Sequence, residues 1–224
     1  MVWLFDLDDT LHDASHAVFG PLRESMTRYI ETELQVGRDD ANVLRIRYWQ
    51  RYGVTLLGLM RHHGVSAAHF LHQTHLLPGL EARVRSPRAD REALRRLPGR
   101  RFVLTNAPRA YAQRVLQALG LSNRFDAVIS IEDMRMFGHL RPKPDVRMFR
   151  HLAARLRVEP SRCVLVEDTL QHQKAAREAG LRTVWMQRFV RGRGAGVARP
   201  PARLTRRPAY VDRRISRLRD LRHD

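Results

Sequence analysis

Short apolar runs alternate with helical patterns along most of this sequence, and this alternation strongly constrains the fold. Five runs have the length and composition of buried strands: 2–7, 101–105, 126–130, 163–167 and 183–186. Between the later runs, the spacing of apolar residues indicates helices at 111–119, 146–156 and 171–179. Strands that alternate with helices predict the α/β class, with a Rossmann-like parallel sheet covered by helices on both faces.

The segment from residue 14 to residue 79 interrupts the alternation. It has no convincing strand, and its pattern indicates helices at 17–34, 41–52, 55–63 and 67–74, with breaks near Gly53 and Gly64. An all-helical insertion after the first strand of a parallel sheet would form a separate cap over the strand ends. The predicted division is therefore a core of residues 1–13 and 80–188, with a helical cap at 14–79.

The end of the chain, residues 189–224, does not continue the pattern. Glycines and prolines between 192 and 201 indicate a linker, and a short helix is expected near 213–221. The net charge of the chain is +18, and half of it lies between residues 188 and 224. We expect a basic, disordered or solvent-facing tail. Binding of RNA, DNA or another acidic partner is the alternative.

Composition and patterning also narrow the class of protein. The chain has 224 residues, 43% of them hydrophobic, which is enough to bury a core. It has no apolar run that could cross a bilayer, and Asp6 interrupts the N-terminal apolar residues too early for a signal peptide. Cys163 is the only cysteine, so an intrachain disulfide is excluded and a cytoplasmic location is expected.

Polar and acidic residues follow three of the predicted strands. Asp6 and Asp8 follow the first, Thr105–Asn106 the second, and Glu167–Asp168 the fourth. In an open parallel sheet, ligands bind beyond the carboxyl ends of the strands. Each residue alone could cap a helix or form a turn, but three strand ends of this kind predict a functional site.

Asp6 and Asp8 are two residues apart, so a regular strand would place both on one face. Adjacent carboxylates repel each other, and a divalent cation relieves the repulsion. Mg²⁺ is the natural ion because it prefers oxygen ligands, and Asp168 offers a further oxygen. One of the two carboxylates could then attack phosphorus. The other could protonate the leaving oxygen and later activate water.

The composition singles out Lys143. Only Lys143 and Lys174 among the 41 basic residues are lysines, and Lys143 lies between Pro142 and Pro144. A lysine in a chain that otherwise uses arginine indicates a place where a compact ammonium fits and a guanidinium does not. Phosphoryl transfer requires positive charge near the non-bridging oxygens, which Lys143 would supply. Retention by chance is the alternative.

Four segments resemble, in order, the motifs of the haloacid dehalogenase superfamily of phosphatases: 6–11, 105–106, 143 and 167–168. The resemblance implies that Asp6 is the nucleophile and Asp8 the acid/base. It also implies that Thr105, Asn106 and Lys143 hold the phosphoryl group. The expected Mg²⁺ ligands are Asp6, the backbone carbonyl of Asp8, and Asp168, with Glu167 supporting them. A helical cap after the first strand is also typical of this superfamily.

A narrower resemblance is to pyrimidine 5′-nucleotidases, carried by residues 5–12, 48–53 and 166–169. It implies a nucleoside monophosphate substrate, with Trp49 and Tyr52 of the cap stacking on the base. The alternative is that these two aromatic residues belong to the cap's own core. A phosphatase of phosphoglycolate or sugar phosphates is the second candidate. A nucleic-acid-binding protein that uses the basic tail is a third, from another class.

The sequence departs from the family pattern at His172. Four residues after the metal-binding aspartate the family usually has Asp or Asn, whereas this chain has an imidazole. A neutral imidazole could support the site by hydrogen bonding, but it offers no oxygen to the metal. The resemblance ends near residue 187.

Overall fold

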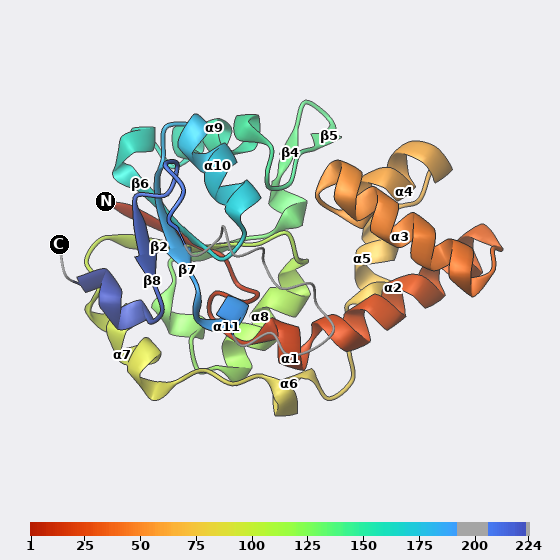
Figure 1. Cartoon of the computed structure of the whole chain (residues 1–224), viewed down its shortest axis with the longest axis horizontal. Coiled ribbons are helices and arrows are strands. Elements are labelled where there is room, and N and C mark those ends of the chain that lie inside the picture. The colour runs from red at the N-terminus through yellow and green to blue at the C-terminus, as the bar shows by residue number, and fades with distance from the viewer. Residues whose placement is uncertain (192–205, 223–224) are drawn as a thin grey trace.

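A parallel sheet forms the centre of the molecule in this computed structural model, which describes residues 1–191 and 206–222 (Figure 1). Within the described residues the sheet has six strands in the order β3-β2-β1-β6-β7-β8. Their bounds are Val2–Phe5 (β1), Arg100–Leu104 (β2), Ala127–Ile129 (β3), Cys163–Glu167 (β6), Arg182–Met186 (β7) and Arg213–Ile215 (β8). All five predicted runs form strands, which confirms the parallel α/β class.

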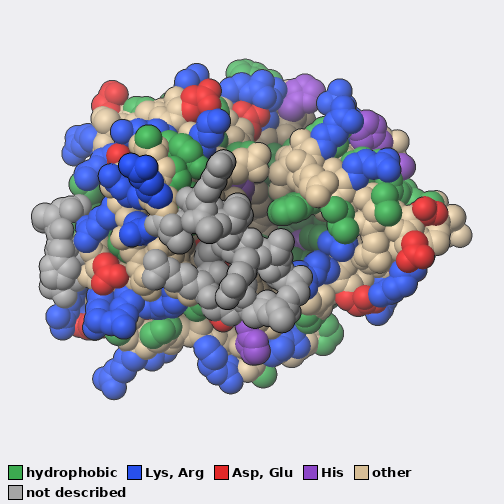
Figure 2. All heavy atoms as spheres, in the orientation of Figure 1, with side chains coloured by type: hydrophobic (Ala, Val, Ile, Leu, Met, Phe, Trp, Pro, Cys, Tyr) green, Lys and Arg blue, Asp and Glu red, His purple; other side chains and the backbone are tan. Residues whose placement is uncertain are grey.

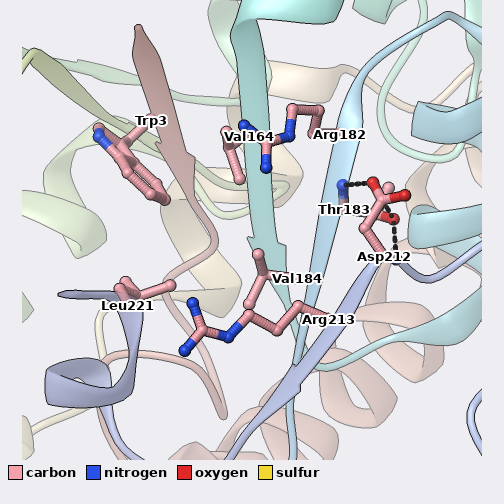
Figure 3. Close-up of a pocket in the computed structure, with 8 residues that line it drawn as sticks. All are labelled: Trp3, Val164, Arg182, Thr183, Val184, Asp212, Arg213 and Leu221. Carbon is pink, nitrogen blue, oxygen red and sulfur yellow. Dashed lines mark hydrogen bonds between the residues drawn. The ribbon is translucent and has the colours of Figure 1, made fainter. Parts of the chain in front are cut away.

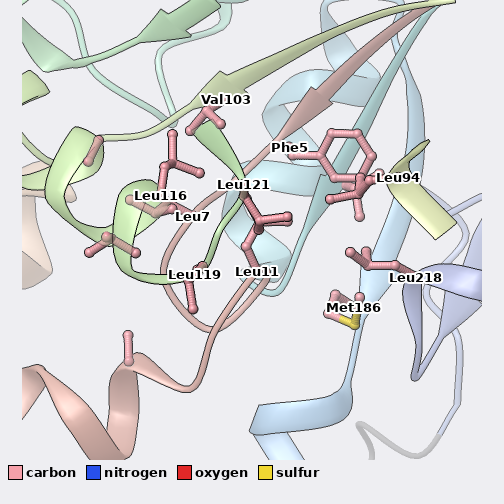
Figure 4. Close-up of a cluster of buried hydrophobic side chains, with 14 of the residues drawn as sticks. Phe5, Leu7, Leu11, Leu94, Val103, Leu116, Leu119, Leu121, Met186 and Leu218 are labelled. Carbon is pink, nitrogen blue, oxygen red and sulfur yellow. The ribbon is translucent and has the colours of Figure 1, made fainter. Parts of the chain in front are cut away.

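Helices cover both faces of the sheet: α6 Leu80–Arg83, α7 Arg88–Arg96, α8 Arg109–Ala118, α9 Val146–Arg155, α10 Leu170–Glu178 and α11 Arg188–Arg191. Alternate residues of β1 point to opposite faces. Trp3 and Phe5 join a hydrophobic cluster with α7 and α8, shown in part in Figure 4. Val2 and Leu4 join a second cluster with α9 and α10. Each residue of β1 is therefore buried, as expected of a central strand in a doubly covered parallel sheet.

The insertion after β1 consists of helices α1 Ala14–Ala17, α2 Phe19–Leu34, α3 Arg38–Tyr52, α4 Thr55–His63 and α5 Ala67–Thr74. The helix predicted at 17–34 is interrupted at Val18, and α1 packs on the core through Ala14 and Ala17. Helices α2 to α5 build a hydrophobic cluster of their own, which includes Ile30 and Phe70. In Figure 1 these helices lie to one side of the sheet, as expected of a cap.

Two loops of the core contact the cap. Ile131, just after β3, is buried in the cap's cluster, and Leu140 packs against it. Leu140 belongs to a hairpin that the sequence analysis missed, formed by β4 Arg135–Met136 and β5 His139–Leu140. At the end of α3, a Cβ on Gly53 would lie 2.9 Å from Cδ of Pro144. A glycine is therefore required where the cap meets the loop that carries Lys143.

The prediction of a basic tail at 189–224 is wrong for residues 206–222, because this segment completes the core. β8 pairs in parallel with β7, and Val211, Ile215, Leu218 and Leu221 are buried. The helix expected near 213–221 is instead this short strand followed by a 3-10 helix, Leu218–Arg222. The four apolar side chains are buried without desolvating the arginines between them, whose side chains stay at the surface or partly exposed. Residues 192–205 of the predicted tail lie outside the described residues.

The docked segment is also held by hydrogen bonds. The Asp212 carboxylate accepts from the backbone N–H of Thr183 at 2.8 Å and from Arg177 Nη1 at 2.8 Å. Next to it lies a cavity of about 160 Å³ (Figure 3), lined by Trp3, Val164, Arg182, Thr183, Val184, Asp212, Arg213 and Leu221. None of the predicted site residues lines this cavity.

Candidate active site

Strand register brings the predicted residues to one edge of the sheet. In the parallel pairing, Phe5 lies beside Val103 of β2 and Val166 of β6. Asp6 therefore leaves β1 level with the ends of both neighbours, and its N–H donates to the Val166 carbonyl at 2.9 Å. Glu167 and Thr105 follow one and two residues beyond these partners, so the side chains of all three strand ends meet there.

Lys143 lies at the centre of this edge and is fully buried. Its Nζ is 2.7 Å from Asp6 Oδ1 and 2.7 Å from Glu167 Oε2. Two hydrogen bonds fix its backbone: Asn106 Nδ2 donates to the Lys143 carbonyl at 2.9 Å, and the Lys143 N–H donates to Asn106 Oδ1 at 3.0 Å. Thr105 is buried and its hydroxyl accepts the N–H of Ala107 at 3.0 Å. Lys143 thus joins three strand ends, two through its ammonium and the third through its backbone.

The pKa values of these groups reflect burial and charge together. Burial, followed by the charge of Glu167, raises the pKa of Asp6 to about 8 even though Lys143 opposes the shift. Burial would also raise the pKa of Glu167, but Lys143 and His172 hold it below its usual range. Burial and the neighbouring carboxylates raise the pKa of Asp168 well above its ordinary value. The single positive charge of Lys143 therefore does not balance the negative charge of all three carboxylates.

Asp6, Glu167 and Asp168 form an acidic cluster in which one oxygen of each lies within 4.8 Å of the others. Buried carboxylates with an excess of negative charge fit a divalent cation with oxygen ligands, and two of the predicted side-chain ligands, Asp6 and Asp168, are in the cluster. The Asp8 side chain is not part of it. Its predicted contribution to the metal was the backbone carbonyl.

The Asp8 carboxylate points instead to a separate pair of donors. The Tyr111 hydroxyl donates to Asp8 Oδ1 at 2.7 Å, and His12 Nε2 lies 2.9 Å from the same oxygen. Burial and the charge of Asp8 raise the pKa of Tyr111 well above its ordinary value, so the phenol keeps its proton. Sequence reasoning missed the roles of Tyr111 and His12. Tyr111 lies in the first turn of α8, far along the chain, and only the packing of α8 on the sheet brings it to Asp8.

His75, at the end of the cap helices, is a further neighbour that the sequence did not reveal. Its ring packs edge-on against Tyr111 with centroids 5.6 Å apart, and its Nδ1 contacts the Thr74 hydroxyl at 2.9 Å. Burial lowers the pKa of His75 to about 4, although Asp8 favours its charged form. His75 is therefore neutral at physiological pH.

His172 lies close to the acidic cluster. Its Nδ1 is 3.1 Å from Glu167 Oε2. The other oxygen of that carboxylate, Oε1, accepts a hydrogen bond from the Thr169 N–H. The imidazole therefore contacts the acidic cluster through Glu167, the residue before Asp168. This position fits the predicted supporting role, which remains a prediction.

The two predicted cap residues, Trp49 and Tyr52, lie on α3. Trp49 is 60% exposed, which excludes it from the cap's core. Tyr52 packs partly against that core, and its hydroxyl lies 2.7 Å from His62 Nε2. Tyr52 immediately precedes Gly53, the residue in contact with Pro144. The end of α3 that carries both aromatic residues therefore adjoins the loop of Lys143.

Comparison with known proteins places this geometry in a family. The model of the haloacid dehalogenase-like hydrolase family matches residues 2–180, and the chain belongs to that family. A solved structure of a conserved haloacid dehalogenase-like protein of unknown function from Agrobacterium tumefaciens is similar over 98% of this chain and 95% of its own, with a TM-score of 0.60 and 25% identity.

Two curated relatives match a shorter stretch. Fructose-1-phosphate phosphatase YqaB of Escherichia coli is 39% identical over 80 residues, which cover 36% of this chain and 40% of the relative. Validoxylamine A 7′-phosphate phosphatase of Streptomyces hygroscopicus is 34% identical over 79 residues, 35% of each. The matches thus span less than half of these relatives. Within the described residues, every helix is too short or too polar to span a membrane.

Proposed function

We propose that the chain is a Mg²⁺-dependent phosphatase that hydrolyses phosphomonoesters through an aspartyl-phosphate on Asp6. The observation that carries the proposal is the buried Lys143 ammonium, 2.7 Å from Asp6 and from Glu167, which form an acidic cluster with Asp168. A lone ammonium in a carboxylate cluster fits a site that holds both a cation and a phosphoryl group. The named relatives, which are phosphatases, support the same reaction.

The residues would divide the reaction as follows. Lys143 holds Oδ1 of Asp6, which leaves Oδ2 to attack phosphorus while the bond to the ester oxygen breaks. Asp8 gives its proton to the departing oxygen. Water then attacks phosphorus, Asp8 takes a proton from it, and Asp6 is released together with inorganic phosphate. Thr105, Asn106 and Lys143 hold the phosphoryl oxygens through both steps.

The cation that we propose is held by Asp6, Asp168 and the backbone carbonyl of Asp8. When bound, Mg²⁺ would supply positive charge to the phosphoryl oxygens in the transition state. It would also favour the ionised form of Asp6, whose pKa of about 8 otherwise keeps much of it protonated at neutral pH. His172 would tune this site through Glu167.

The proposed substrate is a small phosphorylated metabolite, and a nucleoside monophosphate is the first candidate. The resemblance of the cap segment to pyrimidine 5′-nucleotidases supports it. The exposed residue Trp49 also lies one helical turn before Gly53, where the cap meets the Lys143 loop. A sugar phosphate is the second candidate, because the two relatives named above are phosphatases of fructose 1-phosphate and of validoxylamine A 7′-phosphate. Trp49→Ala should raise KM for uridine monophosphate but leave KM for fructose 1-phosphate unchanged.

Nucleic-acid binding as the main function is less well supported. Figure 2 shows Lys and Arg side chains scattered over both core and cap on the visible part of this face. The arginine-rich segment 206–222 is also partly used to complete the core. This segment is therefore part of the folded core and not a free basic tail, although its arginines stay at the surface or partly exposed.

Steady-state assays test the proposed reaction. The wild type should hydrolyse p-nitrophenyl phosphate only with Mg²⁺ present, and a screen of phosphorylated metabolites should identify its substrate class. Asp6→Asn should abolish turnover while the circular dichroism spectrum stays unchanged. Near-normal turnover by Asp6→Asn would disprove the aspartyl-phosphate mechanism.

A further inference from the structure

One oxygen of the Asp8 carboxylate receives two hydrogen bonds from two separate elements. Tyr111 Oη, on α8, is 2.7 Å from Oδ1, and His12 Nε2, in the turn after β1, is 2.9 Å from it. Both side chains are almost completely buried, with Tyr111 2% exposed. Among the residues that the structure describes, no hydrogen bond is formed to the other oxygen, Oδ2.

This asymmetry has a chemical consequence. An oxygen that already accepts two hydrogen bonds is a poor place for a proton, so the proton of a neutral Asp8 is favoured on Oδ2. Two donors from different elements also fix the rotation of the carboxylate, and a fixed orientation is what proton transfer in a transition state requires. Burial strengthens both bonds, since no water competes for the donors.

Tyr111 is itself held in place. Its ring lies in the hydrophobic cluster between α8 and the sheet, and His75 packs edge-on against it. His75 is fixed in turn by Thr74 and by the Leu71 carbonyl, 3.1 Å from Nδ1. The donor to Asp8 thus rests on both the core and the last cap helix.

We propose that Tyr111 and His12 are positioning residues that hold Oδ1 of Asp8 and thereby present Oδ2 as the oxygen that exchanges protons. The inference rests on the proposed phosphatase function. As the ester P–O bond breaks, the proton on Oδ2 passes to the departing oxygen and Asp8 becomes a carboxylate. When water attacks the aspartyl-phosphate, Oδ2 takes its proton, and Asp8 is ready for the next cycle.

The test compares two esters that differ in their need for a proton. Nitrophenolate leaves without one, whereas the leaving oxygen of phenyl phosphate depends more on acid assistance. The quantity to measure is kcat/KM, because it covers the steps up to release of the leaving group and excludes hydrolysis of the phosphoenzyme. Tyr111→Phe removes only the hydroxyl, so the packing of the ring is preserved.

For Tyr111→Phe we expect kcat/KM for phenyl phosphate to fall by about 10- to 100-fold, a part of what acid–base assistance typically supplies. For p-nitrophenyl phosphate the decrease should stay below about threefold, because that ester needs little assistance. His12→Gln, which keeps a donor N–H, should retain more phenyl phosphate activity than His12→Leu. Tyr29→Phe is the matched control, because it removes a tyrosine hydroxyl that lies 3.0 Å from His69 Nδ1 within the cap. Its kcat/KM for both esters should equal that of the wild type.

Equal losses on the two esters, or no loss on phenyl phosphate, would overturn the positioning role. Circular dichroism melting curves identify any variant that fails to fold, and in that case the two His12 variants decide the question. A wild type that hydrolyses neither ester with Mg²⁺ present would refute the proposed function itself, which is a different result.

Discussion

Lys143 and Glu167 form a buried ion pair with 2.7 Å between Nζ and Oε2, and the same ammonium also donates a hydrogen bond to Asp6 Oδ1 at 2.7 Å. Burial would lower the pKa of Lys143, but the two carboxylates raise it above its ordinary value, so the lysine is charged. The pair therefore has a structural role as well as the proposed one in phosphate binding, because the carboxylates are compatible with burial only through the ammonium.

Lys143→Met should destabilise the protein and abolish hydrolysis. Removing one member of a buried ion pair leaves an uncompensated charge and typically costs about 3–5 kcal/mol. Urea unfolding at neutral pH without Mg²⁺ measures this loss. Lys174→Met is the matched control, because Lys174 is exposed, and its free energy of unfolding should match that of the wild type. Equal stabilities of the two variants would contradict the role of the buried pair.

His75 predicts a loss of stability in mild acid. Its pKa is about 4 in the folded protein and 6.5 when unperturbed, so between these values the unfolded chain binds a proton that the folded chain does not. The stabilisation is complete above pH 6.5 and is lost as pH falls towards 4. The linked change is about 3 kcal/mol. Urea unfolding at several pH values measures it.

His75→Gln should flatten this pH dependence between pH 4 and 6.5, whereas His72→Gln, at an exposed position of the same helix, should preserve it. A His75→Gln protein whose stability falls as steeply as that of the wild type would assign the acid sensitivity to other groups.

Leu218 tests the role of the C-terminal segment. It is 1% exposed and lies in the cluster with Met186 and Phe5. Leu218→Ala should lower the free energy of unfolding by about 2–5 kcal/mol, because it removes buried methyl groups and leaves a cavity. Arg219→Ala, at the exposed neighbour, should change it by at most about 0.5 kcal/mol. If Leu218→Ala were equally neutral, the segment would not contribute to the core in solution.

His172 tests the metal site. An amide oxygen is a better ligand for Mg²⁺ than an imidazole nitrogen, so His172→Asn should lower the Mg²⁺ concentration needed for half-maximal activity. Changes beside metal ligands typically alter affinity or activity by about 10- to 100-fold. Thermal unfolding midpoints at increasing Mg²⁺ concentrations give a second readout that is independent of turnover. Superimposable titrations of the two proteins would exclude the supporting role.

The sequence was sufficient to predict five of the six strands of the described sheet because each is built on a short apolar run. Asp6 and Glu167 could be predicted as site residues because each lies at the carboxyl end of such a run. The sequence was not sufficient for β8, where two arginines, Arg213 and Arg214, precede the single buried residue of the strand, Ile215. An edge strand needs few apolar residues, so its pattern resembles that of a solvated segment.

Helix α7 was missed for a similar reason. Its only buried apolar residues are Ala93 and Leu94, and the rest of the helix is mostly charged, so the sequence shows no clear apolar stripe. The contacts of Asp8 lie beyond pattern analysis altogether, because Tyr111 is 103 residues away and reaches Asp8 only through the packing of α8. Local periodicity reports which face of an element is buried, but not which element packs against it.

The central place of β1 in the sheet has a consequence for synthesis on the ribosome. β1 is made first, yet its two neighbours begin at Arg100 and Cys163, so it emerges long before it can pair. Helices α2 to α5 contact one another over short distances in sequence, and such local contacts form fast. We therefore expect the cap to fold while the chain is still being translated. Assembly of the sheet around β1, and of the active site with it, would follow as a late step.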